Sequence, residues 1–281
     1  MPETKADEDT QVRPILRGHK ALIVGIANDS SIAYGCAEAF RSAGADLAIT
    51  WLNEKARGYV EPLGTALGAE IMAPLNVENP GELEALFDEI GARWGKLDSL
   101  IHSIAFAPKE DLQGGLLNCS AAGFARAMDV SCHSFVRMAQ LAAPLMKDGG
   151  TMFAMSYLGA TRVVANYNVM GPVKAALEAA CRYLALELGP NNIRVHAISP
   201  GPLKTRAASG LKDFDRMLNE AMERSPLHQL VDIDDVGFAC AYLATPFASR
   251  ITGGTIYVDG GATWAWSKPS DDARYPRTYN Q

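Results

Sequence analysis

The sequence lacks the features of a membrane, secreted or metal-binding protein. No apolar stretch approaches the ~18 residues that a membrane-spanning helix needs, and residues 1–10 are acidic and polar where a secretory signal would be apolar. Its five cysteines are scattered without a CxxC pair, and its five histidines show no metal-ligand spacing. We therefore expect a cytoplasmic protein with reduced thiols, no membrane attachment and no bound metal.

An excess of positive charge is lacking too. The formal net charge is -6, with acidic and basic residues interspersed, so the chain has no overall positive charge that would favour binding of nucleic acid. A composition of 48% hydrophobic and 21% charged residues is typical of globular proteins and excludes the disordered and fibrous classes. The length of 281 residues permits one large α/β domain or two small domains.

Apolar strand-like segments alternate with helix-like segments along most of the chain. Strands are predicted over 21–26, 46–51, 70–75, 97–104, 151–156, 193–198 and 254–258, and helices over 33–43, 54–67, 80–94, 121–147, 168–189 and 233–244. This alternation predicts βαβ units with parallel strands and right-handed crossovers. Since no linker or repeat interrupts it, we expect one doubly wound Rossmann-type α/β domain with a seven-stranded parallel sheet.

We place this domain at 19–266, between a polar N-terminal extension, 1–18, and a C-terminal tail, 267–281. The polar segment at about 203–225 follows Pro200-Gly201-Pro202 and separates a predicted core strand from the next helix. A segment in this position is expected to act as a helical lid over the substrate.

The segment from Gly25 to Gly35 is small and polar, and it joins the first predicted strand to the first predicted helix. Backbone N–H groups of such a loop can close on a pyrophosphate, which the helix N-terminus also favours. Ser31 is a candidate N-cap or phosphate ligand. The loop is longer than G-x-G-x-x-G and lacks its middle glycine, so taken alone it fits a ligand-free turn about equally well.

The residues after the second predicted strand bear on the choice of nicotinamide nucleotide. An acidic residue there suits the ribose hydroxyls of NAD, whereas a basic residue suits the 2′-phosphate of NADP. Leu52 stands at this position and no basic residue follows at once, which favours NADH. Lys55 and Arg57 follow closely and leave NADPH open.

Tyr167 and Lys174 are seven residues apart, so they share one face of a helix that begins by about residue 167. An ammonium near a phenol lowers the phenol pKa from ~10, which suits a hydroxyl that stabilises an oxyanion. A Tyr/Lys pair is more often mere packing and solvation, but this one follows the fifth strand, where open α/β sheets bind ligands. Because an interior proline kinks a helix, Pro172 predicts a helix start near Asn168.

These residues resemble those of a known family. Ordinary short-chain dehydrogenases/reductases have three residues between the Tyr and the Lys. A divergent branch, the enoyl-acyl-carrier-protein reductases of bacterial type II fatty-acid synthesis, has six, with a second tyrosine ten residues upstream. Tyr157, Tyr167 and Lys174 match this pattern, and the resemblance covers roughly residues 15–265. Further matching segments are 25–35, 102–108, 166–171, 199–202, 207–210 and 258–261.

The resemblance implies reduction of trans-2-enoyl thioesters on acyl carrier protein, with hydride from NADH, as the last step of the fatty-acid elongation cycle. It implies that Tyr167 hydrogen-bonds the thioester oxygen, that Lys174 binds the nicotinamide ribose, and that Tyr157 flanks the acyl chain or thioester. It also implies a homotetramer. The implied cofactor contacts are Gly25, Ser31, Ile32, Asn76, Val77, Ser103, Ile104, Ala105, Lys174, Leu203 and Thr205, and the implied substrate contacts are Phe106, Ala107, Tyr157, Tyr167 and Ala207.

Several positions depart from the family pattern. Leu52 replaces a Gln or basic residue, Asn76 replaces an Asp that meets adenine, and Asp215 replaces a basic residue. The cations near Asp215 form either a docking patch for the acidic carrier protein or a merely solvated face. They are Lys204, Arg206, Lys212 and Arg216.

Two other functions stay open at this point. One is a specialised short-chain reductase that acts on a carbonyl or another activated alkene. The other is a nucleotide-sensing protein without turnover, which the intact Tyr/Lys pair argues against. A hydrolase is disfavoured because Ser156 lacks a G-x-S-x-G elbow, and His102, at a strand end, is expected to be a core histidine.

Overall fold

The computed structural model describes residues 15–203, 205 and 214–265. Three of the four cations near Asp215, and the substrate candidate Ala207, lie outside the described residues. No helix in the described part of the chain is both long and apolar enough to span a bilayer.

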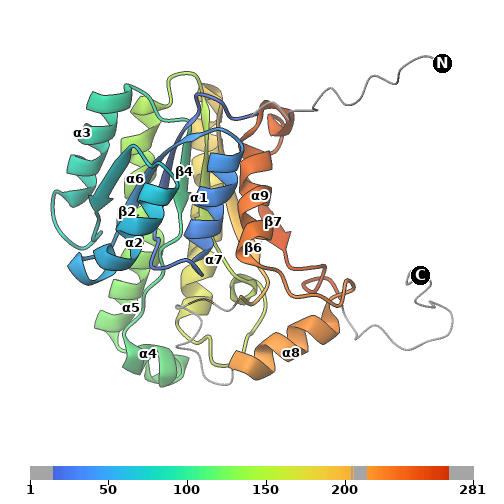
Figure 1. The fold of residues 1–281 in the computed structure, drawn as a ribbon. Coiled ribbons are helices and arrows are strands. Elements are labelled where there is room, and N and C mark those ends of the chain that lie inside the picture. The colour runs from blue at the N-terminus through green and yellow to red at the C-terminus, as the bar shows by residue number, and fades with distance from the viewer. Residues whose placement is uncertain (1–14, 204, 206–213, 266–281) are drawn as a thin grey trace, which may run out of the picture.

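The core of the protein is a seven-stranded, entirely parallel sheet with the order β3-β2-β1-β4-β5-β6-β7 (Figure 1). The strands are β1 (Lys20–Val24), β2 (Asp46–Trp51), β3 (Ile71–Pro74), β4 (Ser99–His102), β5 (Gly150–Met155), β6 (Ile193–Pro200) and β7 (Thr255–Val258). Most of their side chains are buried, as expected for parallel strands covered on both faces. All seven predicted strands are present, which confirms the predicted fold class.

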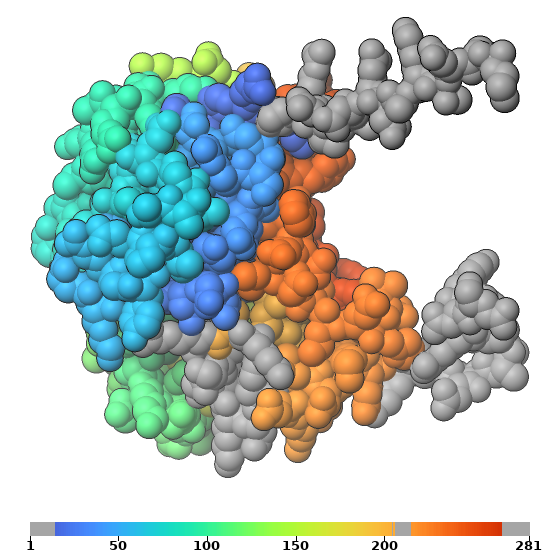
Figure 2. All heavy atoms as spheres, in the orientation of Figure 1, coloured from blue at the N-terminus to red at the C-terminus, as the bar shows by residue number. Residues whose placement is uncertain are grey.

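Helices cover both faces of the sheet and form two separate hydrophobic cores. One face carries α1 (Ile32–Ser42), α2 (Glu54–Ala66) and α9 (Ile233–Ala244). The other carries α3 (Glu82–Trp94), α5 (Ala121–Met128), α6 (Ser134–Ala142) and α7 (Met170–Leu188). Helices α1 and α9, far apart in sequence, lie side by side (Figure 2).

The predicted helix over 121–147 is interrupted, so that prediction was wrong in detail. A π-helical turn over Asp129–His133 separates α5 from α6, and a 3-10 turn over Ala143–Leu145 ends the segment. The Ser134 hydroxyl donates to the Val130 carbonyl at 2.7 Å inside this region. A π turn inserts one extra residue, and such turns are frequent at functional sites.

Two helices lie at the end of the molecule where the site is found. Helix α4 (Lys109–Gln113) follows β4, and α8 (Phe214–Arg224) belongs to the predicted lid; both lie at the same edge of the molecule (Figure 1). Further 3-10 turns among the described residues span Leu116–Asn118, Leu158–Ala160, Gly189–Asn191 and Pro246–Ala248. Asp259 accepts hydrogen bonds from the backbone N–H groups of Gly261 and Thr263, which form a turn after β7.

Candidate active site

The loops after the central strands β1 and β4 touch at the point where the strand order reverses. Gly25 has a φ of +107°, and a Cβ at this position would overlap the Ser103 carbonyl. Ser103 N donates to the Val24 carbonyl at 3.0 Å, which holds the second loop in place. The two loops therefore approach as closely as glycine allows, at the crevice where doubly wound sheets bind ligands.

Gly25→Ala is expected to lower the free energy of unfolding by about 2–4 kcal/mol, because the new methyl group forces the two loops apart at a strained φ. Denaturant unfolding measures this change. Gly58 in α2 is the control, since its Cβ would meet open space and its φ is ordinary. Gly58→Ala should raise the free energy of unfolding by up to ~1 kcal/mol. Equal effects at the two positions would contradict the close approach at Gly25.

Ser31 shapes the loop that precedes α1. Its hydroxyl accepts hydrogen bonds from the backbone N–H groups of Ala27 and Asn28, both at 3.0 Å, and donates to Asn28 Oδ1 at 3.0 Å. Ser31 occupies the N-cap position of α1, as the sequence predicted, but its side chain makes no cap hydrogen bond. Ile32 begins α1 and packs against the core.

The side chains expected near the adenosine ribose of the cofactor are poorly suited to bind the 2′-phosphate of NADPH. Leu52 is 56% exposed and carries no polar group. Arg57 lies over the Trp51 ring at 5.5 Å and binds Glu61 at 3.1 Å, so its charge is already paired. This arrangement favours NADH over NADPH.

The loop with Asn76 and Val77 is held by two arginines that sequence reasoning missed. Arg126 binds both oxygens of Glu78, at 2.6 and 2.9 Å, and lies 4.4 Å from the centre of the Phe106 ring. Arg137 donates to the Val77 carbonyl at 2.9 Å. Asn76 Oδ1 accepts from Glu78 N at 3.0 Å, so its amide helps shape the loop. The loops after β3 and β4 are thereby joined.

The loop after β4 runs along the same edge of the sheet. Ser103, Ile104 and Ala107 are half-buried, whereas Ala105 and Phe106 are exposed. Phe106 is fixed through both of its backbone groups by Ser131 of the π turn, at 2.8 and 3.0 Å. The π turn therefore positions a loop that the family resemblance assigns to cofactor and substrate.

The two tyrosines lie together. The ring centres of Tyr157 and Tyr167 are 4.9 Å apart, at an interplanar angle of 57°. Asn166 and Asn168 flank Tyr167 with φ values of 64° and 43°, a left-handed backbone conformation that is concentrated at functional sites. The Asn168 amide donates to the Leu112 carbonyl at 2.5 Å and anchors this segment.

The helix that carries Lys174 begins slightly later than predicted. It starts at Met170 rather than near Asn168, because Asn168 adopts its left-handed conformation. Tyr167 therefore lies in the loop before α7, and the prediction that it shares a helix face with Lys174 was wrong. Pro172 therefore lies in the first turn, where its missing N–H breaks no hydrogen bond of the helix. Lys174 follows two residues later and is buried.

The predicted lowering of the Tyr167 pKa by Lys174 was wrong. Burial raises the pKa of Tyr167 well above its usual value, and the neighbouring Tyr157 adds to this shift. Burial also raises the pKa of Tyr157 to about 12, against the opposing field of Arg224. Both phenols thus keep their protons at neutral pH, so each is available as a neutral hydrogen-bond donor.

Lys174 is buried beside the end of β5. Its Nζ donates to the Met155 carbonyl at 2.6 Å. Burial lowers the pKa of Lys174 to about 8, although Cys132, Cys181 and Glu178 oppose the shift. The ammonium is therefore close to its titration point at physiological pH.

His102 is a core histidine, as predicted. It is fully buried at the end of β4, and its Nε2 lies 2.7 Å from the Ser134 hydroxyl. Its Nδ1 has no hydrogen-bond partner among the described residues. Burial, and to a lesser degree the charge of Lys174, lowers the pKa of His102 to about 3, so the ring is neutral.

The predicted lid meets the site at Tyr157. The Tyr157 hydroxyl donates to Met217 Sδ of α8 at 3.3 Å. Leu203, which begins the segment, is buried, and Thr205 N donates to the Leu203 carbonyl at 2.8 Å. Met217, which sequence reasoning missed, therefore brings α8 onto the aromatic pair.

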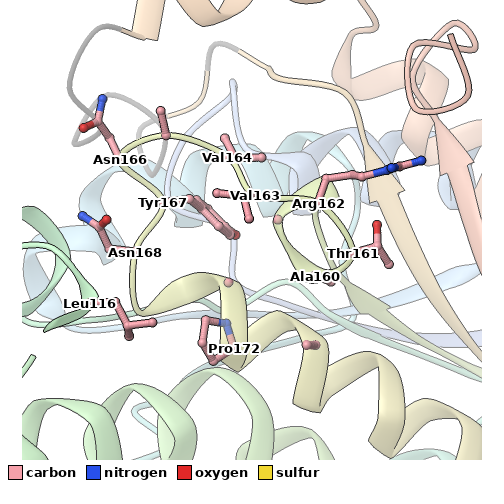
Figure 3. A pocket seen from close by; sticks show the side chains of 14 residues that line it. Leu116, Ala160, Thr161, Arg162, Val163, Val164, Asn166, Tyr167, Asn168 and Pro172 are labelled. Atoms are coloured by element: carbon pink, nitrogen blue, oxygen red, sulfur yellow. The ribbon is translucent and has the colours of Figure 1, made fainter. Parts of the chain in front are cut away.

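A cavity of about 440 Å³ lies beside Tyr167 (Figure 3). It is lined by Leu116, by the loop 159–168, and by Gly171, Pro172 and Ala175 of α7. Tyr157 and Lys174 are not among its lining residues. This cavity therefore borders the site at Tyr167.

The strand order and the placement of Tyr167 and Lys174 at the carboxyl edge define a Rossmann-type protein of the short-chain dehydrogenase/reductase class. A family model described as enoyl-(acyl carrier protein) reductase matches residues 25–263. The chain belongs to this family.

Individual relatives agree with the family match. The enoyl-[acyl-carrier-protein] reductase [NADH] FabI of Salmonella typhimurium is 43% identical, covering 88% of this chain and 94% of its own length. The enoyl-(acyl-carrier-protein) reductase of Anaplasma phagocytophilum, solved with NAD, has a TM-score of 0.87 and 41% identity, covering 91% of this chain and 98% of that one. The Bacillus cereus enzyme, solved with NADP+ and an indole naphthyridinone, has a TM-score of 0.87 and 39% identity, covering 89% and 98%.

Proposed function

We propose that this protein is an NADH-dependent enoyl-[acyl-carrier-protein] reductase, an oxidoreductase that reduces the carbon–carbon double bond of trans-2-enoyl thioesters in the last step of fatty-acid elongation. The observation that carries the proposal is the grouping of Tyr157, Tyr167 and Lys174 at the carboxyl edge of the sheet. The chain is also 43% identical, over 88% of its length, to a reductase named for NADH.

The residues present fit a dinucleotide. The close approach at Gly25 leaves backbone, and no side chain, facing the crevice, and Ser31 and Ile32 stand at the start of α1, where a pyrophosphate is favoured. Asn76 and Val77 would hold the adenine end. Ser103, Ile104, Ala105 and Lys174 would hold the nicotinamide ribose, with Leu203 and Thr205 beside the nicotinamide. When bound, NADH supplies the hydride.

The protein's own groups then place the substrate and stabilise charge. Reduction at the β-carbon builds negative charge on the thioester oxygen, and the neutral Tyr167 hydroxyl donates a hydrogen bond to that oxygen. The raised pKa of Tyr167 keeps this proton in place across the physiological range. Lys174 orients the ribose, and Tyr157 flanks the thioester, with Phe106, Ala107 and Ala207 along the acyl chain. Helix α8, the described part of the predicted lid, would limit the access of water beside Tyr157.

The test is a turnover assay with NADH and a crotonyl thioester, followed by the loss of nicotinamide absorbance. Thioester reduction is expected to be faster with NADH than with NADPH, because Leu52 offers no charge to a 2′-phosphate. Absence of turnover with both nucleotides would refute the proposal. Preferred reduction of a free ketone in competition would instead favour the specialised carbonyl reductase.

The proposed carrier of the substrate is acyl carrier protein, and the proposed location is the cytoplasm, where the five free cysteines remain reduced. The cation Arg216 on α8 is already paired with Glu220 at 2.9 Å, which weakens it as a docking contact. Binding of the acidic carrier to this edge should therefore weaken with salt, but less steeply than a cluster of unpaired cations would give.

The proposed oligomer is a homotetramer. Large apolar side chains are exposed on two separate helices, Tyr183 and Leu186 on α7 and Phe238 and Tyr242 on α9. A tetramer with D2 symmetry needs more than one self-complementary face, and exposed apolar clusters are typical of such faces. Light scattering should give a mass of about four chains, and a monomer mass would refute the assembly.

A further inference from the structure

Glu178 is a buried acid with no part in the proposed chemistry. It lies four residues after Lys174 on α7, and both residues are only 4% exposed. Residues four apart lie on the same face of a helix. Burying a carboxylate is costly unless it is hydrogen-bonded and its charge is balanced. Glu178 therefore needs a hydrogen-bond donor and a nearby positive charge.

The partners of Glu178 and Lys174 are consecutive residues of one strand end. The Ser156 hydroxyl donates to Glu178 Oε1 at 2.6 Å, and Lys174 donates to the Met155 carbonyl at 2.6 Å. Tyr157 follows directly in the chain. Two side chains of α7 are therefore hydrogen-bonded to the segment that leads into Tyr157.

Glu178 is the carboxyl group among the groups that act on Lys174, and the other two are Cys132 in the π turn and Cys181 on α7. Lys174 in turn acts on His102 on β4. Burial lowers the pKa of His102 to about 3, raises the pKa of Cys132 and raises that of Cys181 to about 12, so these groups are neutral near pH 7. The phenols of Tyr157 and Tyr167 are neutral as well.

We propose that Glu178 is a positioning residue for the reduction: it balances the buried charge of Lys174 and, through Ser156, fixes the end of β5 that leads into Tyr157. The proposal rests on the proposed function. The hydrogen bond of Lys174 goes to the Met155 carbonyl, so Glu178 acts on the ammonium through its field. Loss of this field should therefore change the pH range of activity, whereas loss of packing alone would not.

The first experiment compares pH profiles of kcat/KM for NADH. In the wild type, activity should fall as pH rises through about 8, where Lys174 loses its proton. Glu178→Gln keeps the shape and an acceptor for Ser156 but removes the charge, so this limb should move down by about one pH unit. The matched control is Ser156→Ala, which removes the hydrogen bond at 2.6 Å but keeps the carboxylate. Its limb should stay where it is in the wild type while kcat falls.

A second measurement covers the case in which Glu178→Gln does not fold alone. Lys174→Met leaves the Glu178 carboxylate buried without a counter-charge, and the double variant Lys174→Met/Glu178→Gln removes both charges. The double variant should unfold at a higher temperature than Lys174→Met.

An unshifted pH limb in Glu178→Gln, or a double variant no more stable than Lys174→Met, would overturn the inference. A wild type without any turnover would instead refute the proposed function. The stability comparison stands in either case because it does not depend on activity.

Discussion

Replacement of Tyr167 by Phe is expected to lower kcat for enoyl thioester reduction by roughly 10²–10³-fold, the usual cost of removing one oxyanion donor. The hydroxyl is lost while the ring and its contact with Tyr157, at 4.9 Å between ring centres, are kept. The KM for NADH should change little, because the phenol acts on the substrate oxygen rather than on the nucleotide. Steady-state kinetics at saturating NADH measure this split.

Tyr157→Phe is the matched control. It removes the hydroxyl that donates to Met217 at 3.3 Å and leaves the Tyr167 hydroxyl in place, so its loss in kcat should be smaller. Circular dichroism checks that both variants fold. An unchanged kcat in Tyr167→Phe would mean that the charge on the thioester oxygen is stabilised by another group.

Replacement of Lys174 by Met is expected to lower kcat/KM for NADH by about 10²-fold, because a nucleotide that is no longer held by Lys174 shifts away from the hydride-transfer geometry.

The pH dependence of kcat/KM should follow the charge of Lys174. The lowered pKa of about 8 means that the wild type is charged below this pH and loses the charge above it. Wild-type kcat/KM should therefore fall through pH 8, and the variant should show no such limb.

Two measurements separate this effect from misfolding. Lys174→Arg keeps the charge but not the compact ammonium geometry, so it should retain the cation and recover only part of the activity. Circular dichroism shows whether Lys174→Met is folded under the assay conditions. A folded Lys174→Met variant as active as the wild type would contradict the role of Lys174.

The fold was predictable because it depends on local patterns. Each strand is an apolar run and each helix an amphipathic one, and their strict alternation leaves a parallel sheet as the arrangement that buries both faces. The period of a helix predicted one shared helix face for Tyr167 and Lys174, and this prediction was wrong, because α7 begins at Met170 and Tyr167 lies in the loop before it. The π turn at Asp129–His133 could not be predicted, because one extra residue in a helical run leaves the apolar pattern nearly unchanged.

The electrostatics of the site could not be predicted from spacing. The sequence placed Lys174 near Tyr167 and so predicted a lowered phenol pKa, whereas burial raises it. Desolvation depends on everything packed around a group, including residues from distant strands and helices. The hydrogen bond between α7 and the end of β5 is equally non-local, since Ser156 and Glu178 are 22 residues apart.

The sequence by itself therefore determined the class of fold, the family and the residue types at the site. The tertiary structure decided which of these residues are in contact and how burial shifts their pKa values. Arg126 joins Glu78 and Phe106, Met217 reaches Tyr157, and Glu178 faces the buried end of β5. The physical reason is that hydrophobic periodicity is a property of neighbouring residues, whereas burial and charge pairing are properties of packed elements.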